Sequence, residues 1–178
     1  MENLHDLFEE TLRDIYYAEK AITKALPKMA KKASSEDLAA AFQEHLQQTE
    51  GQIERLEQVF KLIEKPARGK KCHAIEGMIE EAEEIIKEAE SDTVRDAGML
   101  AAAQAVEHYE ISRYGTLVAW AQKLGLSEAA ELLEETLDEE KETDEKLSEL
   151  AESEINAEAD QDEDEEEPPR AKKAATRR

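Results

Sequence analysis

The sequence predicts an all-α protein, an antiparallel bundle of four long helices with a long crossover that carries a short fifth helix. Ala, Glu, Leu and Lys dominate the composition, whereas the 178 residues include only 6 Gly and 4 Pro, and such a composition favours helices. Apolar residues recur every three or four positions through four long segments, which is the period of one helix face. Polar side chains interrupt each of these series near its midpoint.

A first helix is expected from about Asn3 to Lys32. Its core-facing series consists of Phe8, Leu12, Ile15, Ile22, Leu26 and Met29. Glu19 stands at the one place in this series where an apolar residue is missing. A carboxylate therefore faces the predicted core near the middle of the helix.

A second helix begins after the serine pair at 34–35, since serine followed by acidic residues is typical of a helix start. It runs to about residue 64. Its core-facing series consists of Leu38, Phe42, His45, Thr49, Gln52, Leu56, Phe60 and Ile63. Three consecutive members, His45, Thr49 and Gln52, are polar.

The connection to the third long helix is itself long. A basic loop with Pro66 and Gly69 ends the second helix, and a short amphipathic helix follows at about 74–89. The third long helix is expected at about 92–124. Its core-facing series consists of Met99, Ala103, Val106, Glu110, Tyr114, Leu117 and Ala121.

The fourth long helix is expected from about Ser127 to Leu150. It follows Gly125, which fits the C-terminal end of a helix. Its core-facing series consists of Leu133, Leu137, Glu140, Thr143 or Asp144, and Leu147. A glutamate again lies near the middle.

The position of the long crossover favours one topology. A long connection between two helical pairs lets the second pair repeat the first with pseudo-twofold symmetry, which is the ferritin-like arrangement. A five-helix up-and-down bundle fits the same spacing. In either case the bundle domain is expected to span residues 1–152.

Residues 153–178 are expected to form a charged tail, acidic from Asp160 to Glu167 and basic at its end. Such a composition buries too little apolar surface to offset the entropy of ordering. We therefore expect the tail to be disordered when free.

Charge and hydropathy restrict partners and location. The formal net charge of −22 repels nucleic acid and anionic membranes, so neither is an expected partner. No apolar run approaches the ~20 residues that span a bilayer, and the first residues lack the pattern of a signal peptide. A single cysteine, Cys72, allows no internal disulfide. We expect a cytoplasmic protein.

The polar residues in the core-facing series predict a metal centre. Each long helix contributes at least one, and a buried ionised carboxylate without a partner is very costly. Two divalent ions held by glutamates and histidine from four facing helices are a known solution in such bundles. Oxygen-rich ligands with imidazole suit iron or manganese, and zinc is compatible. The candidate ligands are Glu19, His45, Glu107, Glu110, Glu139 and Glu140.

A simpler interpretation stays open. Glutamate is common in this chain, so some glutamates fall on core-facing positions by chance and can reach solvent at the edge of the bundle. His45 could be a core histidine that is hydrogen-bonded to a neighbour.

Four segments carry a resemblance to a known family. They are Y-Y-A-E-K at 16–20, E-H-L-Q-Q-T-E-G-Q-I-E-R-L-E at 44–57, V-E-H-Y-E-I-S-R-Y-G-T-L at 106–117 and T-L-D-E-E-K-E-T-D-E-K-L at 136–147. These segments are similar to the YciE/YciF family of ferritin-like proteins, more to YciF, over about residues 4–151. The resemblance implies a bacterial stress-response protein, a rubrerythrin-like helix arrangement and a homodimer. It supports the six candidate ligands as the polar core.

Compared with rubrerythrin, Glu107-x-x-Glu110 is similar to the paired glutamates of the third helix. Thr49-x-x-Gln52 and Glu140-x-x-Thr143 stand where Glu-x-x-His motifs would be expected. The first hypothesis is therefore a stress-response protein that binds two metal ions and, if active, binds iron or consumes peroxide or oxygen. The second is a structural or interaction bundle whose metal site has decayed.

Overall fold

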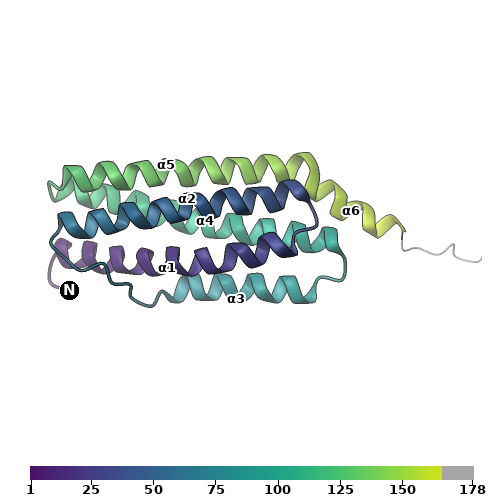
Figure 1. Cartoon of the computed structure of the whole chain (residues 1–178), viewed down its shortest axis with the longest axis horizontal. Coiled ribbons are helices and arrows are strands. Elements are labelled where there is room, and N and C mark those ends of the chain that lie inside the picture. Colours follow the sequence, from purple (N-terminus) through teal and green to yellow (C-terminus); the bar gives the residue numbers. More distant parts are fainter. Residues whose placement is uncertain (166–178) are drawn as a thin grey trace, which may run out of the picture.

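The computed structural model describes residues 1–165 and has four long helices that run side by side (Figure 1). Their contacts close a ring. The four helices are α1 (Leu4–Lys32), α2 (Glu36–Leu62), α4 (Asp92–Lys123) and α5 (Ser127–Leu150). Helices α1 and α5 each pack against both α2 and α4, so every helix is antiparallel to its two neighbours. This arrangement confirms the predicted all-α bundle.

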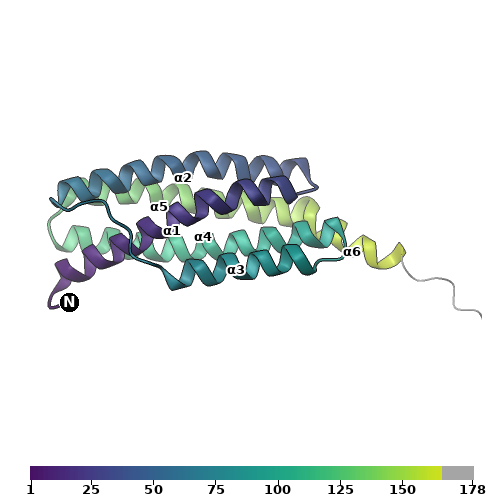
Figure 2. The ribbon, with the colours of Figure 1, turned by 60° about the horizontal axis from the view of Figure 1, so that its bottom comes forward.

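The crossover helix α3 (His73–Glu88) lies outside the ring and packs against α1 and α4 (Figure 2). Because α2 and α4 run in the same direction, the chain must return along the whole bundle between them. The segment 63–72 and α3 make this return. Since α2 packs against α1 and α5, the ring has four members, and the five-helix alternative is not adopted.

Local sequence signals define the helix ends. The side chains of Asn3, Ser35 and Ser91 accept hydrogen bonds from backbone N–H groups in the first turns of α1, α2 and α4, as expected for N-caps. Gly125 has a φ of 74°, a left-handed conformation that glycine adopts without strain and that ends many helices. Gly98 allows close packing of α3 on α4, because a Cβ there would clash with Ile85.

The turn between α1 and α2 is fixed to α4 by a buried carboxylate. Asp96, only 3% exposed, accepts hydrogen bonds from the backbone N–H groups of Ser34 and Ser35 at 2.9 and 2.7 Å, and from the Ser34 hydroxyl at 2.6 Å. The Ser34 N–H also lies 3.1 Å from Oδ1, so neither oxygen of this carboxylate lacks a hydrogen-bond partner. A buried acid in this chain can therefore have a structural role when its oxygens are hydrogen-bonded. The acids in the bundle centre can be compared with Asp96 in this respect.

Helical structure continues beyond the expected domain end at residue 152. One turn of wider, π-helical backbone, η1 (Ala151–Ile155), leads into α6 (Asn156–Glu165), and Ile155 is only 1% exposed. Leu147, Ala151 and Ile155 are all buried at four-residue intervals, so they extend the apolar face of α5. Residues 153–165 of the tail expected at 153–178 are thus helical here, and residues 166–178 lie outside the described residues.

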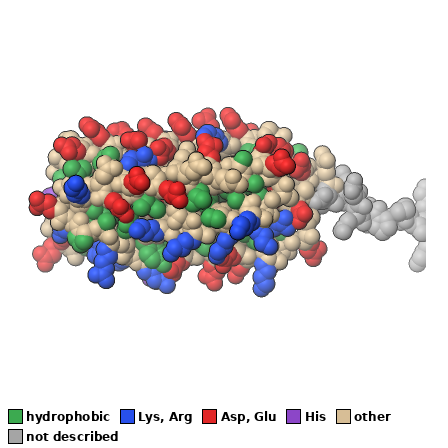
Figure 3. Space-filling model, in the orientation of Figure 1, with side chains coloured by type: hydrophobic (Ala, Val, Ile, Leu, Met, Phe, Trp, Pro, Cys, Tyr) green, Lys and Arg blue, Asp and Glu red, His purple; other side chains and the backbone are tan. Residues whose placement is uncertain are grey.

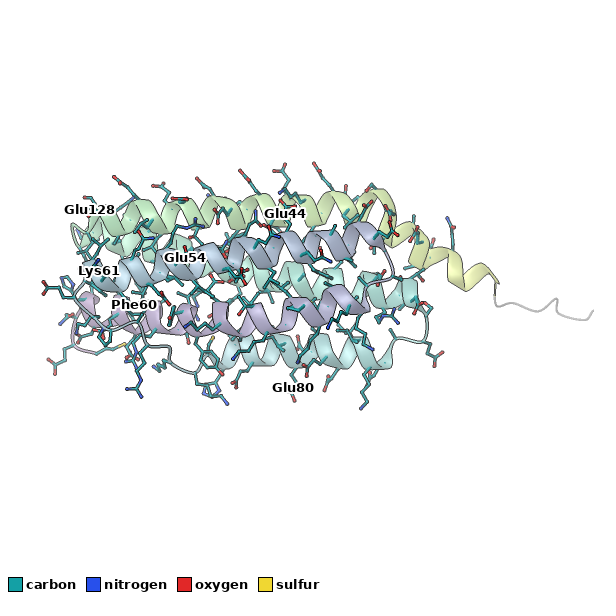
Figure 4. All side chains as sticks on the ribbon, in the orientation of Figure 1. Glu44, Glu54, Phe60, Lys61, Glu80 and Glu128 are labelled. Carbon is teal, nitrogen blue, oxygen red and sulfur yellow. The ribbon has the colours of Figure 1, made fainter. Side chains whose placement is uncertain are left out.

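Surface charge is unevenly distributed. Acidic side chains line the edge formed by α5, whereas lysines and arginines gather on the side of α1 and α3 (Figure 3). Exposed glutamates such as Glu80 and Glu128 stand on the outside of the helices (Figure 4). In residues 1–165, no helix is both long and apolar enough to cross a membrane.

Candidate metal centre

A histidine and three glutamates meet in the bundle centre. His45 comes from α2, Glu107 and Glu110 from α4, and Glu140 from α5, and each side chain is at most 4% exposed. One potential ligand atom from each residue lies within 4.8 Å of those from the other three. Nδ1 of His45 is 3.2 Å from Oε1 of Glu107, and Nε2 is 3.9 Å from Oε2 of Glu140. The helix midpoints therefore meet at one level.

Glu19 of α1 lies beside this group and is fully buried. The hydroxyl of Tyr114, on α4, donates a hydrogen bond to Oε1 of Glu19, and Oε2 has no partner. The charges of Glu140 and Glu19 both act on Glu110. Glu19 thus belongs electrostatically to the same centre.

The carboxylates of this centre lack the hydrogen bonds that buried acids require. Both side-chain oxygens of Glu107, Glu110 and Glu140 have no hydrogen-bond partner, and neither does Nε2 of His45. Buried polar atoms are normally satisfied, as Asp96 is. Because an unpaired buried charge is very costly, these atoms need protons or a cation.

Burial changes the acid–base behaviour of the centre. Burial, then repulsion by Glu140, raises the pKa of Glu19 and of Glu107 well above the usual value. Burial, then repulsion by Glu19, does the same to the pKa of Glu110. Burial raises the pKa of Glu140 to about 7 and lowers the pKa of His45 to about 4. The metal-free centre therefore favours neutral imidazole and protonated acids.

Glu139, the remaining candidate ligand, has partners elsewhere. Its carboxylate pairs with Arg55 of α2 and accepts a hydrogen bond from Nε2 of Gln52 at 3.2 Å. Its side chain is 28% exposed. Arg55 also bonds to Glu135 at 3.0 Å and to Thr136 at 2.9 Å. The structure therefore does not bring Glu139 into the central group.

Two side chains at the positions where Glu-x-x-His motifs would be expected also have hydrogen-bond partners. The Thr49 hydroxyl donates to the backbone oxygen of His45 at 2.9 Å. The Thr143 hydroxyl donates to the backbone oxygen of Glu139 at 3.1 Å and lies 3.2 Å from Oε1 of Gln48. Neither threonine is directed to a ligand position. His45, one turn before Thr49, supplies the only imidazole of the central group.

Two residues that bind the carboxylates of candidate ligands, Tyr114 and Arg55, were not identified from the sequence. Tyr114 was assigned to core packing, because it belongs to the apolar series of its helix. Arg55 has no periodic signal, although it stands three residues after Gln52 and thus on a neighbouring part of the helix surface. The direction of a tyrosine hydroxyl and the reach of an arginine both depend on the packed partner helix.

The central group has the chemistry of a divalent-cation site. Zinc–oxygen and zinc–nitrogen bonds are about 2.0–2.2 Å long, so ligand atoms on opposite sides of an ion stand about 4 Å apart. The observed spread of up to 4.8 Å needs only a small contraction. A buried His/Glu group of this kind could hold a metal ion.

Comparisons with known proteins agree with this fold. The family model described as "Domain of unknown function (DUF892)" matches residues 3–160. The protein YciF of Escherichia coli strain K12 is 50% identical over 164 residues, which cover 90% of this chain and 97% of YciF. These matches extend along nearly the whole bundle.

Solved structures give the same result. The crystal structure of the Escherichia coli stress protein YciF has a TM-score of 0.84 at 50% identity, over 88% of this chain and 99% of that chain. YcfI of Rhodopseudomonas palustris, for which a structural role has been suggested, has a TM-score of 0.81 at 50% identity. The match covers 83% of this chain and 94% of that chain. A protein of Xanthomonas campestris shares the fold with a TM-score of 0.71 at 22% identity, over 90% of this chain and 99% of that chain.

Proposed function

Since the chain belongs to the DUF892 family and is a homologue of the stress protein YciF, we propose that it is a stress-response protein that binds metal ions. Two divalent ions, iron or manganese, occupy the centre of the bundle in each chain. The observation that carries this proposal is the set of buried, unpartnered oxygens of Glu107, Glu110 and Glu140 beside His45.

Charge supports two ions per chain. Glu19, Glu107, Glu110 and Glu140 carry four negative charges when ionised, and His45 is neutral because burial lowers its pKa to about 4. Two divalent ions balance this charge. The residues that would hold the ions are His45, Glu107, Glu110 and Glu140, together with Glu19 beside them. Two-metal sites commonly have ions about 3.5–4 Å apart.

The bound ions would supply redox or Lewis-acid chemistry to a buried site. Iron binding, or the consumption of peroxide or dioxygen, is the activity that this chemistry suits. Tyr114 orients Glu19 through its hydrogen bond, and Arg55 keeps Glu139 away from the centre. The surrounding helices exclude water from the carboxylates.

Metal analysis of the full chain, purified without chelator, tests the proposal. We expect about two iron or manganese ions per chain and a melting temperature that falls after the metal is removed, since ligands that bind only the folded state stabilise it. Near-zero metal content after incubation with each ion, with unchanged melting on chelation, would reject the proposal.

Two matched substitutions sharpen this test. Glu110→Gln keeps the size of a fully buried side chain but cannot ionise. It should therefore stabilise the metal-free chain, in which Glu110 must take up a proton to be buried, and abolish most of the metal-dependent rise in melting temperature. Glu134→Gln, on the exposed face of α5, should leave both quantities unchanged.

A structural role is the second candidate, favoured by the role suggested for the Rhodopseudomonas palustris relative and by the engaged side chains of Gln52, Thr49 and Thr143. It predicts that Glu110→Gln stabilises the chain equally with and without added metal.

The homodimer and cytoplasmic location implied by the resemblance and the sequence belong to the first proposal. Light scattering of the full chain tests the dimer.

A further inference from the structure

A narrow apolar pocket of about 50 Å³ lies between α1, α3 and α4 and extends to the candidate metal centre. Aliphatic side chains line most of it, among them Ile22 of α1, Ile79 of α3 and Val106 of α4. Ala25, Ala82, Ala102 and Ala103 also line it. Because alanine side chains are short, they leave space where larger residues would close the packing.

The two ends of the pocket differ in character. Lys28 and Glu83, which form an exposed ion pair at 3.2 Å, line its solvent side. His45 and Glu107, both buried, line its inner end. The pocket therefore connects the surface beside α3 with two of the candidate metal ligands.

The size and lining of the pocket restrict its occupant. About 10–15 Å³ is enough for one water molecule, and an apolar cavity of about 150 Å³ binds benzene or xenon. A volume of about 50 Å³ thus suits a molecule of a few heavy atoms. Water needs two to four polar partners, and between the Lys28–Glu83 pair at the solvent side and His45 with Glu107 at the inner end the lining is aliphatic. A charged ligand would lose its hydration without compensation.

We propose that this pocket binds a small, uncharged, apolar molecule of the size and polarity of dioxygen and holds it against His45 and Glu107. This inference rests on the proposed function, because it makes the pocket the binding site for a gaseous co-substrate of the metal centre. The crossover helix α3 then has a role beyond connection, since it forms one wall of the pocket and supplies none of the candidate ligands.

That division of roles allows the pocket to be altered without changing a ligand. Ala82, on α3, is 8% exposed and lines the pocket, so Ala82→Leu should fill it. Glu81, its neighbour in sequence, is exposed, and Glu81→Leu is the matched control on the same helix. Ala103→Val, on α4, is a milder way to reduce the pocket if Ala82→Leu does not fold.

Xenon is a suitable probe, because it is apolar, inert and close to dioxygen in its preference for dry cavities. The experiment records the histidine ring resonances of the full, metal-free chain by NMR under increasing xenon pressure. We expect a saturable shift of the His45 signals and none for His108, whose side chain is 68% exposed. Ala82→Leu should reduce the His45 shift at least fivefold, whereas Glu81→Leu should preserve it.

Two results would overturn the inference. One is a His45 response in the unsubstituted chain that is no larger than that of His108. The other is an unchanged His45 response in both folded pocket variants. Metal uptake measured on the same samples separates this inference from the proposed function. Metal uptake without a xenon response rejects the pocket alone, whereas a xenon response in a chain that takes up no metal rejects the metal-binding function and with it the co-substrate role.

Discussion

Nδ1 of His45 lies 3.2 Å from Oε1 of Glu107, so one imidazole from α2 faces a carboxylate of α4 inside the bundle. Because burial lowers the pKa of His45 to about 4, the ring is neutral near pH 7 and has one N–H to donate. It can satisfy only one of the carboxylate oxygens around it. Without a cation, protons must remove the remaining charge, and this requirement determines how stability depends on pH.

The metal-free chain should lose stability as the pH rises from about 6.5 to 8. Burial raises the pKa of Glu140 from 4.5 to about 7. The contribution of this group to the free energy of unfolding is therefore complete below pH 4.5 and is lost as the pH rises through 7. In total this one group accounts for about 3 kcal/mol, of which only about 1 kcal/mol is lost above pH 6.5. The pKa values of Glu19, Glu107 and Glu110, raised well above the usual value, have the same sign and add to the loss in this window. The lowered pKa of His45 acts oppositely, but only as the pH falls from 6.5 to 4.

Urea denaturation in the presence of chelator measures this pH dependence. Glu140→Gln should flatten the profile between pH 6.5 and 8, because it removes one of the titrating groups. With metal bound, the slope should reverse, since protons compete with the metal for the same ligands. A metal-free chain that is more stable at pH 8 than at pH 6.5 would contradict the assignment of these acids.

Glu139 and Glu140 should differ sharply as metal ligands, although they are adjacent in sequence. Glu140 is fully buried without a partner, whereas Glu139 pairs with Arg55. We expect Glu140→Gln to weaken metal binding by about 10–100-fold or more, the loss typical even of residues that only support ligands. Glu139→Gln should leave the affinity nearly unchanged. Calorimetric titration of both variants with Mn²⁺ measures the difference, and equal losses would place Glu139 among the ligands.

Tyr114→Phe should destabilise the metal-free chain at pH 8 by about 1–3 kcal/mol, the cost of leaving a buried acceptor without its donor. The Tyr114 hydroxyl is the donor to Glu19, and both residues are fully buried. Tyr16→Phe is the control, because its acceptor Glu57 is 48% exposed and water can replace the lost bond. If the two variants lose the same stability in urea denaturation, the Tyr114 hydroxyl has no special role.

Periodicity in the sequence predicts which side chains lie together in the bundle core, and their role as metal ligands stays a prediction. Glu19, His45, Glu110 and Glu140 each replace an apolar residue at mid-helix, and four antiparallel helices of similar length bring their midpoints to one level. Glu107 follows from Glu110, since residues three apart share a helix face. The long crossover favoured the ring of four helices, whereas the spacing alone left a five-helix up-and-down bundle open.

Periodicity does not identify the side chains on other helices with which a residue pairs. Adjacent residues on a helix point about 100° apart, so only one of Glu139 and Glu140 can face the centre, and Arg55 on another helix decides which. The length of the last helical segment was also missed. Leu147, Ala151 and Ile155 maintain the four-residue interval, but the acidic residues around them dominate the composition and suggest a tail.

Ile155→Ala separates the ordered segment of the structure from the disordered tail expected from composition. Ile155 is 1% exposed and η1 packs against α4, so its truncation should cost about 2–4 kcal/mol, as for other buried aliphatic side chains. Val94→Ala is the control, because Val94 is also aliphatic but 45% exposed on α4, and surface substitutions usually change stability by less than about 0.5 kcal/mol. Thermal denaturation of the two variants measures the difference. If Ile155→Ala is as mild as Val94→Ala, the bundle ends before residue 155, near the boundary at 152 that composition favours.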